Sequence, residues 1–251
     1  MRRTLIAIVA VGAFATAGVA YAATGFNTYT AKVTVNGKGS AKKPAIAAFT
    51  EQFGAKPSGA GYADPLTDIK LTIDNAHVSW KGFATCSAAQ INSAKNDTVC
   101  PKSALLGTGP VVAELWSAAE PQEPAVPCNP ILDVWNAGGG KTTYFFKLPA
   151  GHVCAGLQTG AVVAWTGSVK NAGKNFVDDT PLPPPVSTNA GNLGLYAALL
   201  KEDIVFPKKA KGKTSFLVST GCKGSRKYTV AFTATNGARS ESATVAGKAK
   251  C

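Results

Sequence analysis

The chain has 251 residues and a formal net charge of +12 at pH 7, and 45% of its residues are hydrophobic. This length suits one large β domain or two small ones, and the apolar fraction is sufficient for a buried core. The 26 glycines and 15 prolines, together with many alanines, favour close-packed sheets with tight turns over helices.

The first 22 residues predict a secretory signal peptide. Arg2 and Arg3 precede an uncharged apolar run, and the small-x-small motif at residues 20–22 predicts cleavage before Ala23. A retained membrane anchor is disfavoured, because the run is short for a spanning helix, which needs about 20 residues. We therefore expect an extracellular mature chain of residues 23–251, with a charge of +10 and no transmembrane anchor.

Alternating apolar and polar residues predict many short strands along the mature chain. The stretches YTAKVTV, which ends at a turn dipeptide, and TDIKLTID alternate most clearly. Strands at this spacing predict an all-β fold, an antiparallel β-sandwich with long Pro/Gly-rich loops. Two smaller β domains, residues 23–117 and 128–251, are the alternative. Further strands are expected at residues 46–53, 78–83, 110–116, 131–135, 142–148, 161–169, 195–206 and 214–220.

Two Pro-rich stretches, residues 117–127 and 178–194, are expected to be extended loops, and the second contains three successive prolines. Asp178 and Asp179 open the second stretch. They could bind Ca²⁺ with loop carbonyls, but no EF-hand spacing surrounds them, so solvated loop acids are the favoured interpretation. Residues 193–200 fit a short helix or a strand.

The six cysteines predict three disulfide bonds, because an even number in an exported chain favours disulfides. Their wide spacing, and the positions of His77 and His152, do not fit a zinc site, and no metal is expected. Beside the C-terminal pair discussed next, three connectivities remain open, of which neighbour pairing is the simplest. The cysteines are Cys86, Cys100, Cys128, Cys154, Cys222 and Cys251.

The dipeptide Asn236-Gly237 predicts a two-residue hairpin near the C-terminus. In that hairpin the numbers of paired residues add to 473, so the apolar residues of both strands share one face. The same register places Cys222 opposite Cys251, with Cα atoms about 4.5 Å apart, which is within reach of a disulfide. The last residue is therefore expected to lock the final strand to its partner.

Positive charge is concentrated at the C-terminus, where residues 201–251 carry eleven Lys or Arg against three acids. This predicts contact with an anionic polymer, such as a cell-wall polymer, rather than with nucleic acid. The alternative, favoured from charge alone, is that lysines at strand edges keep the protein soluble. If residues 209–213 are extended, their alternate lysines project together. The candidate binding residues are Lys208, Lys209, Lys211, Lys213, Lys223, Arg226 and Lys227.

No catalytic or cofactor motif is present. The nucleophile motif G-x-S-x-G is absent, and LLGTGP lacks the third glycine of a dinucleotide site, so we interpret it as a strand-opening turn. A glycan hydrolase using His77, or a lectin-like module using exposed tryptophans, are alternative functions, although tryptophans are by default core residues. The tryptophans are Trp80, Trp116, Trp135 and Trp165.

Several stretches together resemble a large paralogous group of secreted, disulfide-containing proteins of uncharacterised function from high-GC Gram-positive soil bacteria. They are YTAKVTV with AKKP, IKLTID, ATCSAAQI…VCPKSALLGTGPV, and the terminus STGC…YTVAFTATNG…C. Cys128 and Cys154 lie outside this pattern. The resemblance supports the β architecture and assigns no activity. We therefore expect a secreted, non-enzymatic binding or structural protein without a cofactor; no ligand or oligomeric state is indicated.

Overall fold

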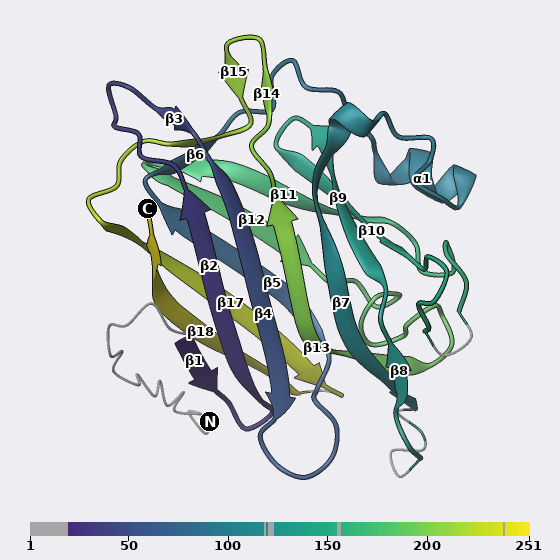
Figure 1. Cartoon of the computed structure of the whole chain (residues 1–251). Helices are drawn as coiled ribbons and strands as arrows, with labels where there is room; N and C mark the ends of the chain where they lie inside the picture. Colours follow the sequence, from purple (N-terminus) through teal and green to yellow (C-terminus); the bar gives the residue numbers. More distant parts are fainter. Residues whose placement is uncertain (1–19, 118, 120–122, 155–156, 238) are drawn as a thin grey trace, which may run out of the picture.

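The computed structural model describes residues 20–117, 119, 123–154, 157–237 and 239–251 (Figure 1), so most of the expected signal peptide lies outside the described residues. Regular structure is almost entirely β-strand. The elements are β1 Ala20–Ala23, β2 Asn27–Asn36, β3 Ala45–Ile46, β4 Ala48–Pro57, β5 Leu66–Asp74, β6 Ala76–Val78, α1 Ala88–Ala94, a 3₁₀ turn Lys102–Ala104, β7 Leu105–Ser117, β8 Val126–Cys128, β9 Ile131–Gly138, β10 Lys141–Lys147, β11 Trp165–Ala172, β12 Asn175–Pro181, β13 Leu195–Phe206, β14 Ala210–Lys211, β15 Thr214–Ser215, β16 Leu217–Ser219, β17 Ser225–Asn236 and β18 Arg239–Lys250.

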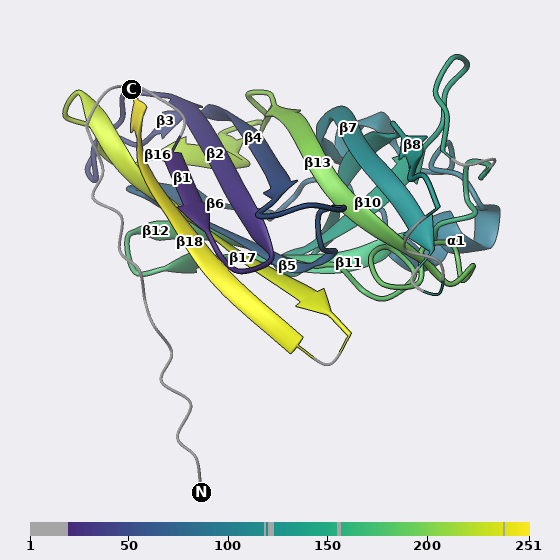
Figure 2. The same cartoon turned by 90° about the horizontal axis from the view of Figure 1, so that it is seen from below.

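Thirteen of the described strands form one antiparallel sheet in the order β1-β2-β4-β13-β7-β9-β10-β11-β12-β5-β17-β18, with β8 beside β7. The sheet curls until β18 lies alongside β1 and β2 (Figure 2). The predicted all-β antiparallel class is confirmed, but the sheet is barrel-like rather than a sandwich. The reason is long-range pairing: β5, from the first half of the chain, pairs with both β12 and β17 from the second half.

Strand alternation supplies the core inside this curled sheet. On β2 the side chains of Tyr29, Ala31, Val33 and Val35 are buried and alternate with more exposed neighbours. The ring of Phe232, on β17, stacks on that of Tyr29 with centroids 4.8 Å apart. Opposite walls therefore touch at this end of the molecule, and each large side chain buried there contributes roughly 1.5–3 kcal/mol.

Side chains, rather than strand pairing, join the two edges of the sheet. The carboxylate of Glu241 on β18 accepts a hydrogen bond from the backbone N–H of Phe26 at 3.3 Å. The guanidinium of Arg239 lies 4.8 Å from the centroid of the Phe26 ring. Tyr228 Oη donates to the carbonyl of Ala31 at 3.1 Å. Among the described strands, β18 has no backbone pairing with β1 or β2.

The C-terminal hairpin of β17 and β18 forms as expected, but its register differs by two residues. Asn236 pairs with Arg239, so the turn lies one position later, and Val230 rather than Tyr228 faces Val245. Because side chains alternate with a period of two, this shift keeps the same residues on the interior face. Tyr228 now lies opposite Gly247.

All three disulfides join neighbouring cysteines along the chain, which confirms the simplest pairing. Cys222 and Cys251 are bridged with Cα atoms 6.1 Å apart. They are not directly opposite, since the backbone N–H of Cys251 donates to the carbonyl of Gly224 at 3.2 Å. The predicted lock on the last strand is therefore present, although the predicted register is wrong.

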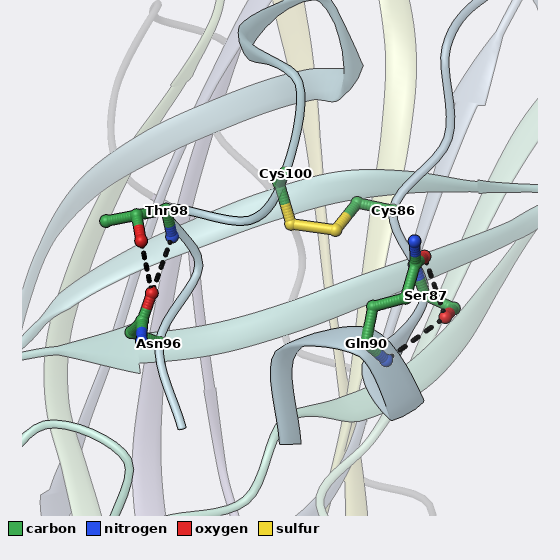
Figure 3. Close-up of a disulfide and its surroundings, with 6 residues drawn as sticks. All are labelled: Cys86, Ser87, Gln90, Asn96, Thr98 and Cys100. Carbon is green, nitrogen blue, oxygen red and sulfur yellow. Dashed lines mark hydrogen bonds between the residues drawn. A yellow bond between two sulfur atoms is a disulfide. The ribbon is translucent and has the colours of Figure 1, made fainter. Parts of the chain in front are cut away.

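The segment closed by Cys86 and Cys100 contains helix α1, which the sequence analysis did not predict (Figure 3). The backbone N–H of Gln90 donates to Ser87 Oγ at 3.3 Å, and Gln90 Oε1 accepts from the backbone N–H of Ser87 at 2.9 Å. This capping box satisfies two donors at the helix start. Ile91 is buried in a cluster with the disulfide and covers the outer face of β9 and β10.

Two predicted irregular segments belong to strands. Residues 178–181, predicted as loop, complete β12, where Asp178 pairs with Leu71 of β5. The glycines of LLGTGP lie inside β7 and do not form an opening turn. A Cβ atom on Gly109 would lie 1.9 Å from the carbonyl oxygen of Asp203 on β13. Glycine is therefore required there by the close approach of two strands.

Candidate ligand-binding cavity

The interior of the curled sheet is not completely filled. A cavity of about 100 Å³ lies between the wall formed by β4, β13, β7 and β9 and the wall formed by β10, β11, β12 and β5. β4 and β12 face one another across the interior, because the ring centroids of Phe49 on β4 and Phe176 on β12 are 5.8 Å apart. The lining is mainly apolar and includes Phe53, Leu71, Val111, Leu132 and Trp165.

Two loops cover one end of this cavity. The loop after β10 contributes Leu157 and Gln158, and the Pro-rich loop after β12 contributes Leu182. The Cys128–Cys154 disulfide also lines the cavity and joins β8 to the first of these loops. Gln158 is the one exposed side chain among the lining residues, so the cavity comes nearest to solvent at this end.

Three carboxyl groups from three strands line the cavity: Glu51 of β4, Glu202 of β13 and Asp178 of β12. Their exposed fractions are 8%, 7% and 5%. In the register of β4 and β13, Glu51 pairs with Ile204 and Glu202 pairs with Phe53, so the two glutamates occupy inward positions of adjacent strands. The described lining contains no Lys, Arg or His. The cavity therefore combines apolar walls with uncompensated acids.

The three carboxyl groups differ in their hydrogen bonds. Tyr144 Oη donates to Asp178 Oδ1 at 2.9 Å, and Thr180 Oγ1 donates to Tyr144 Oη at 2.7 Å. Neither Glu51 nor Glu202 accepts a hydrogen bond from a described residue, and no hydrogen bond is among the causes of their raised pKa values. The two glutamates therefore have free acceptor capacity. Trp165 Nε1 is likewise buried without a hydrogen-bond partner.

Burial raises the pKa of all three carboxyl groups. Burial, with a smaller contribution from the charge of Asp178, raises the pKa of Glu202 to about 8. Burial raises the pKa of Asp178 to about 7, although the hydrogen bonds from Tyr144 and Thr180 oppose the shift. The pKa of Glu51 lies well above its ordinary value, because of burial and then of Glu202 and Asp178. Burial thus favours the protonated, neutral form of these carboxyl groups, which needs no counter-ion in the cavity.

The residues predicted to bind anionic polymer do not form one surface. Arg226, only 2% exposed, was wrongly expected at the surface. Its guanidinium donates to the carbonyls of Asn75 at 3.0 Å and Gly37 at 2.8 Å and to Ser219 Oγ at 2.8 Å. It therefore holds together β16, the end of β2 and the turn between β5 and β6. An arginine can satisfy acceptors in this way because its donors form a rigid fork.

The predicted row of lysines at residues 209–213 is also absent. Lys209 Nζ donates to the backbone carbonyl of Leu105, and the chain turns back at Gly212 so that β14 pairs with β15. The exposed members of the set are Lys208, Lys211, Lys213, Lys223 and Lys227. For these five lysines, contact with an anionic polymer stays a prediction.

Of the residues named for the hydrolase and lectin alternatives, only Trp165 lines the cavity. His77 Nε2 lies 3.0 Å from the carbonyl oxygen of Gly173, and His77 does not line the cavity. Trp135 and Trp165 are buried, whereas Trp80 and Trp116 are half-buried. All four tryptophans lie among the described residues, and none of them is fully exposed.

In the described ranges, no cluster of three or more His, Cys, Asp or Glu side chains is placed to hold a metal ion. Nor does any helix there have the length and apolar character needed to cross a membrane.

The sequence analysis missed Glu51 and Glu202 and assigned Asp178 to a loop. The strand alternation indicates their burial. Glu51 lies on the same face of its strand as the buried Phe49 and Phe53, and Glu202 lies on the same face as the buried Ile204. Comparison of the chain with protein-family models, curated proteins and solved structures finds no match. The function has to be argued from the chemistry of the cavity.

Proposed function

We propose that the protein is an exported binding protein that encloses a small, mainly apolar molecule inside its curled sheet. The observation that carries the proposal is the unfilled apolar cavity of about 100 Å³ that contains two carboxyl groups to which no described residue donates a hydrogen bond. Protein interiors normally pack without such voids, and their buried polar groups are normally hydrogen-bonded. A concave apolar site with a few polar groups is the usual form of a ligand site.

Extracellular location is part of the proposal. The N-terminal sequence has the pattern of a signal peptide. Three disulfides support it, because such bonds persist in oxidising compartments and are rare where thiols are kept reduced.

The cavity volume limits the ligand. A dry apolar cavity of about 150 Å³ takes up benzene, so about 100 Å³ suits a molecule of roughly four or five non-hydrogen atoms. Ligands this small reach at most about 1.5 kcal/mol per atom. The dissociation constant is therefore expected to be about micromolar at best.

The test is an NMR titration of the oxidised protein with 1-butanol and n-butylamine. We expect saturable shifts at amides of the cavity strands with at least one probe. Ala197 lines the cavity, so Ala197→Phe should abolish them, whereas Ala210→Phe, at an exposed position of β14, should leave them unchanged. Absence of saturable shifts with both probes, or unchanged binding in Ala197→Phe, would contradict the proposal.

A further inference from the structure

We propose that the cavity selects a cationic ligand, a compact alkylammonium whose charged nitrogen lies beside Glu51 and Glu202, with Asp178 on the facing wall. This inference rests on the proposed function and adds the chemical class of the ligand. It follows from the charges and hydrogen-bonding capacity of the lining, from the aromatic rings beside the acids, and from the poor fit of the alternatives.

The first argument is charge. The three acids are brought together from β4, β13 and β12 into a space whose described lining has no basic side chain. The charges of Glu202 and Asp178 contribute to the raised pKa of Glu51, and the charge of Asp178 contributes to the raised pKa of Glu202. Buried charge of one sign is costly unless it is paired. A cation is the partner that this arrangement lacks.

The second argument is hydrogen bonding. An ammonium group has three donors and no acceptor. Glu51 and Glu202 have unused acceptor oxygens, and Asp178 accepts at Oδ1 from Tyr144. Hydrogen bonds between an ammonium and carboxylates are charge-assisted and are stronger than those between neutral groups. An alcohol has one donor, so it satisfies fewer of these acceptors.

The third argument concerns the remainder of the ligand. Tyr144, Phe146 and Trp165 line the cavity, with ring centroids 5.4 Å apart for Tyr144 and Trp165 and 5.1 Å apart for Phe146 and Trp165. Aromatic faces attract organic cations and also pack against alkyl groups. Among the described residues no three carboxyl groups are placed to hold one metal ion, so the nitrogen is expected to contact Glu51 and Glu202 directly and to be attracted by Asp178 through its charge.

Protons compete with such a cation. The titratable groups that line the cavity are Glu51 on β4, Glu202 on β13, Asp178 on β12 and Tyr144 on β10. Asp179, the next residue, forms an ion pair with Lys70 at 2.9 Å, which occupies its carboxylate. Because burial raises the pKa of Asp178 to about 7 and that of Glu202 to about 8, these two acids bind protons at pH 6 and release them at higher pH, and burial also raises the pKa of Glu51. An alkylammonium, like a lysine side chain with a pKa of about 10.4, stays charged throughout this range.

The experiment is calorimetric titration of the oxidised protein at pH 8.5 with three probes of equal chain length: n-butylamine, 1-butanol and butyrate. We expect the amine to bind at least about tenfold tighter than the alcohol, and butyrate to bind most weakly. Between pH 6 and pH 8.5 the affinity for the amine should rise at least about tenfold, while that for 1-butanol should not rise.

The double variant Glu51→Gln/Glu202→Gln should reduce the preference for the amine to within about twofold and retain binding of 1-butanol. The control Asp203→Asn removes one carboxyl group, at the residue that follows Glu202 on β13. Asp203 faces away from the cavity and accepts from Gln52 Nε2 at 2.8 Å, so the preference should be unchanged. If the double variant does not fold, the pH series on the wild-type protein and on Glu202→Gln decides the question.

The outcomes separate the two proposals. Binding of 1-butanol without tighter binding of the amine would overturn the cationic ligand and leave the binding function in place. Failure of all three probes to bind would overturn both. If the double variant still prefers the amine, the ammonium group binds elsewhere, and the proposal that Glu51 and Glu202 bind it is overturned.

Discussion

Glu202 has acidic and basic chain neighbours, yet its carboxyl group faces an apolar interior. It lies between Lys201, which is exposed, and Asp203, which is half-buried on the other face of β13. Strand geometry alone places successive side chains on opposite faces. The position of Glu202 on the interior face therefore decides its titration, and its pKa rises to about 8 because of burial.

This shift predicts how stability depends on pH. The pKa of Glu202 rises from an ordinary value of 4.5 to about 8 in the folded protein, so the folded state holds its proton more tightly than the unfolded state. The resulting stabilisation is complete below about pH 4.5 and is lost as pH rises through 8. The unfolding free energy of the wild-type protein, measured in urea, should therefore decrease between pH 5 and pH 9. In Glu202→Gln this decrease should be smaller by a few kcal/mol, because one pKa unit corresponds to about 1.4 kcal/mol.

The matched control is again Asp203→Asn, which should keep the wild-type dependence on pH. Because the amide cannot ionise, Glu202→Gln should also be more stable than the wild-type protein at pH 9. Parallel stability curves for Glu202→Gln and wild type across this range would show that Glu202 does not carry the shift.

At the scale of elements, the C-terminal hairpin shows how tertiary contacts choose between registers. Both registers bury the same face, so local sequence does not separate them. In the observed register the ring of Tyr228 covers Gly247, where a Cβ atom would lie 2.3 Å from Tyr228 Oη. The same hydroxyl donates to the carbonyl of Ala31. An aromatic side chain that covers a cross-strand glycine is a known way to set register.

Removal of the Cys222–Cys251 bridge should destabilise the protein by about 3–4 kcal/mol, because the bridge closes a loop with a sequence separation of 29. Urea unfolding of the variant Cys222→Ser/Cys251→Ser measures this loss without leaving a free thiol. The variant Cys86→Ser/Cys100→Ser, whose loop has a separation of 14, should lose somewhat less. Peptide mapping that joins Cys251 to Cys154 would refute the observed pairing.

At the scale of the whole molecule, closure of the sheet depends on its first strand as well as its last. β1 spans Ala20–Ala23, pairs with β2 and lies near β18 (Figure 2). The expected cleavage before Ala23 removes three of its four residues. The mature protein would then be closed by β2 and β18, through the contacts of Phe26 with Glu241 and Arg239.

Intact-mass analysis of the secreted protein tests this processing. We expect a chain that begins at Ala23 and is six hydrogens lighter than the reduced chain, because three disulfides are formed. Since every cysteine is bridged, no thiol should react with an alkylating agent before reduction. A mass that includes residues 1–22, or any alkylation without reduction, would contradict the prediction.

The amino-acid sequence by itself determined most strands, the antiparallel β class and the disulfide that holds the last residue. These features follow from local alternation, turn residues and cysteine spacing, which act over short distances along the chain. It did not reveal helix α1, which at seven residues is too short for a helical period to be evident.

Only the tertiary structure decided the order of strands, the hairpin register, the burial of Arg226 and the meeting of Glu51, Glu202 and Asp178 in one cavity. Alternation states which side chains share a face of a strand, but not what that face will be packed against. That depends on pairings between distant segments, such as β5 with β17, and on how far the sheet curls before its edges meet. Acidic residues on the interior face of a strand form a site only when the curled sheet closes around them and removes their carboxyl groups from water.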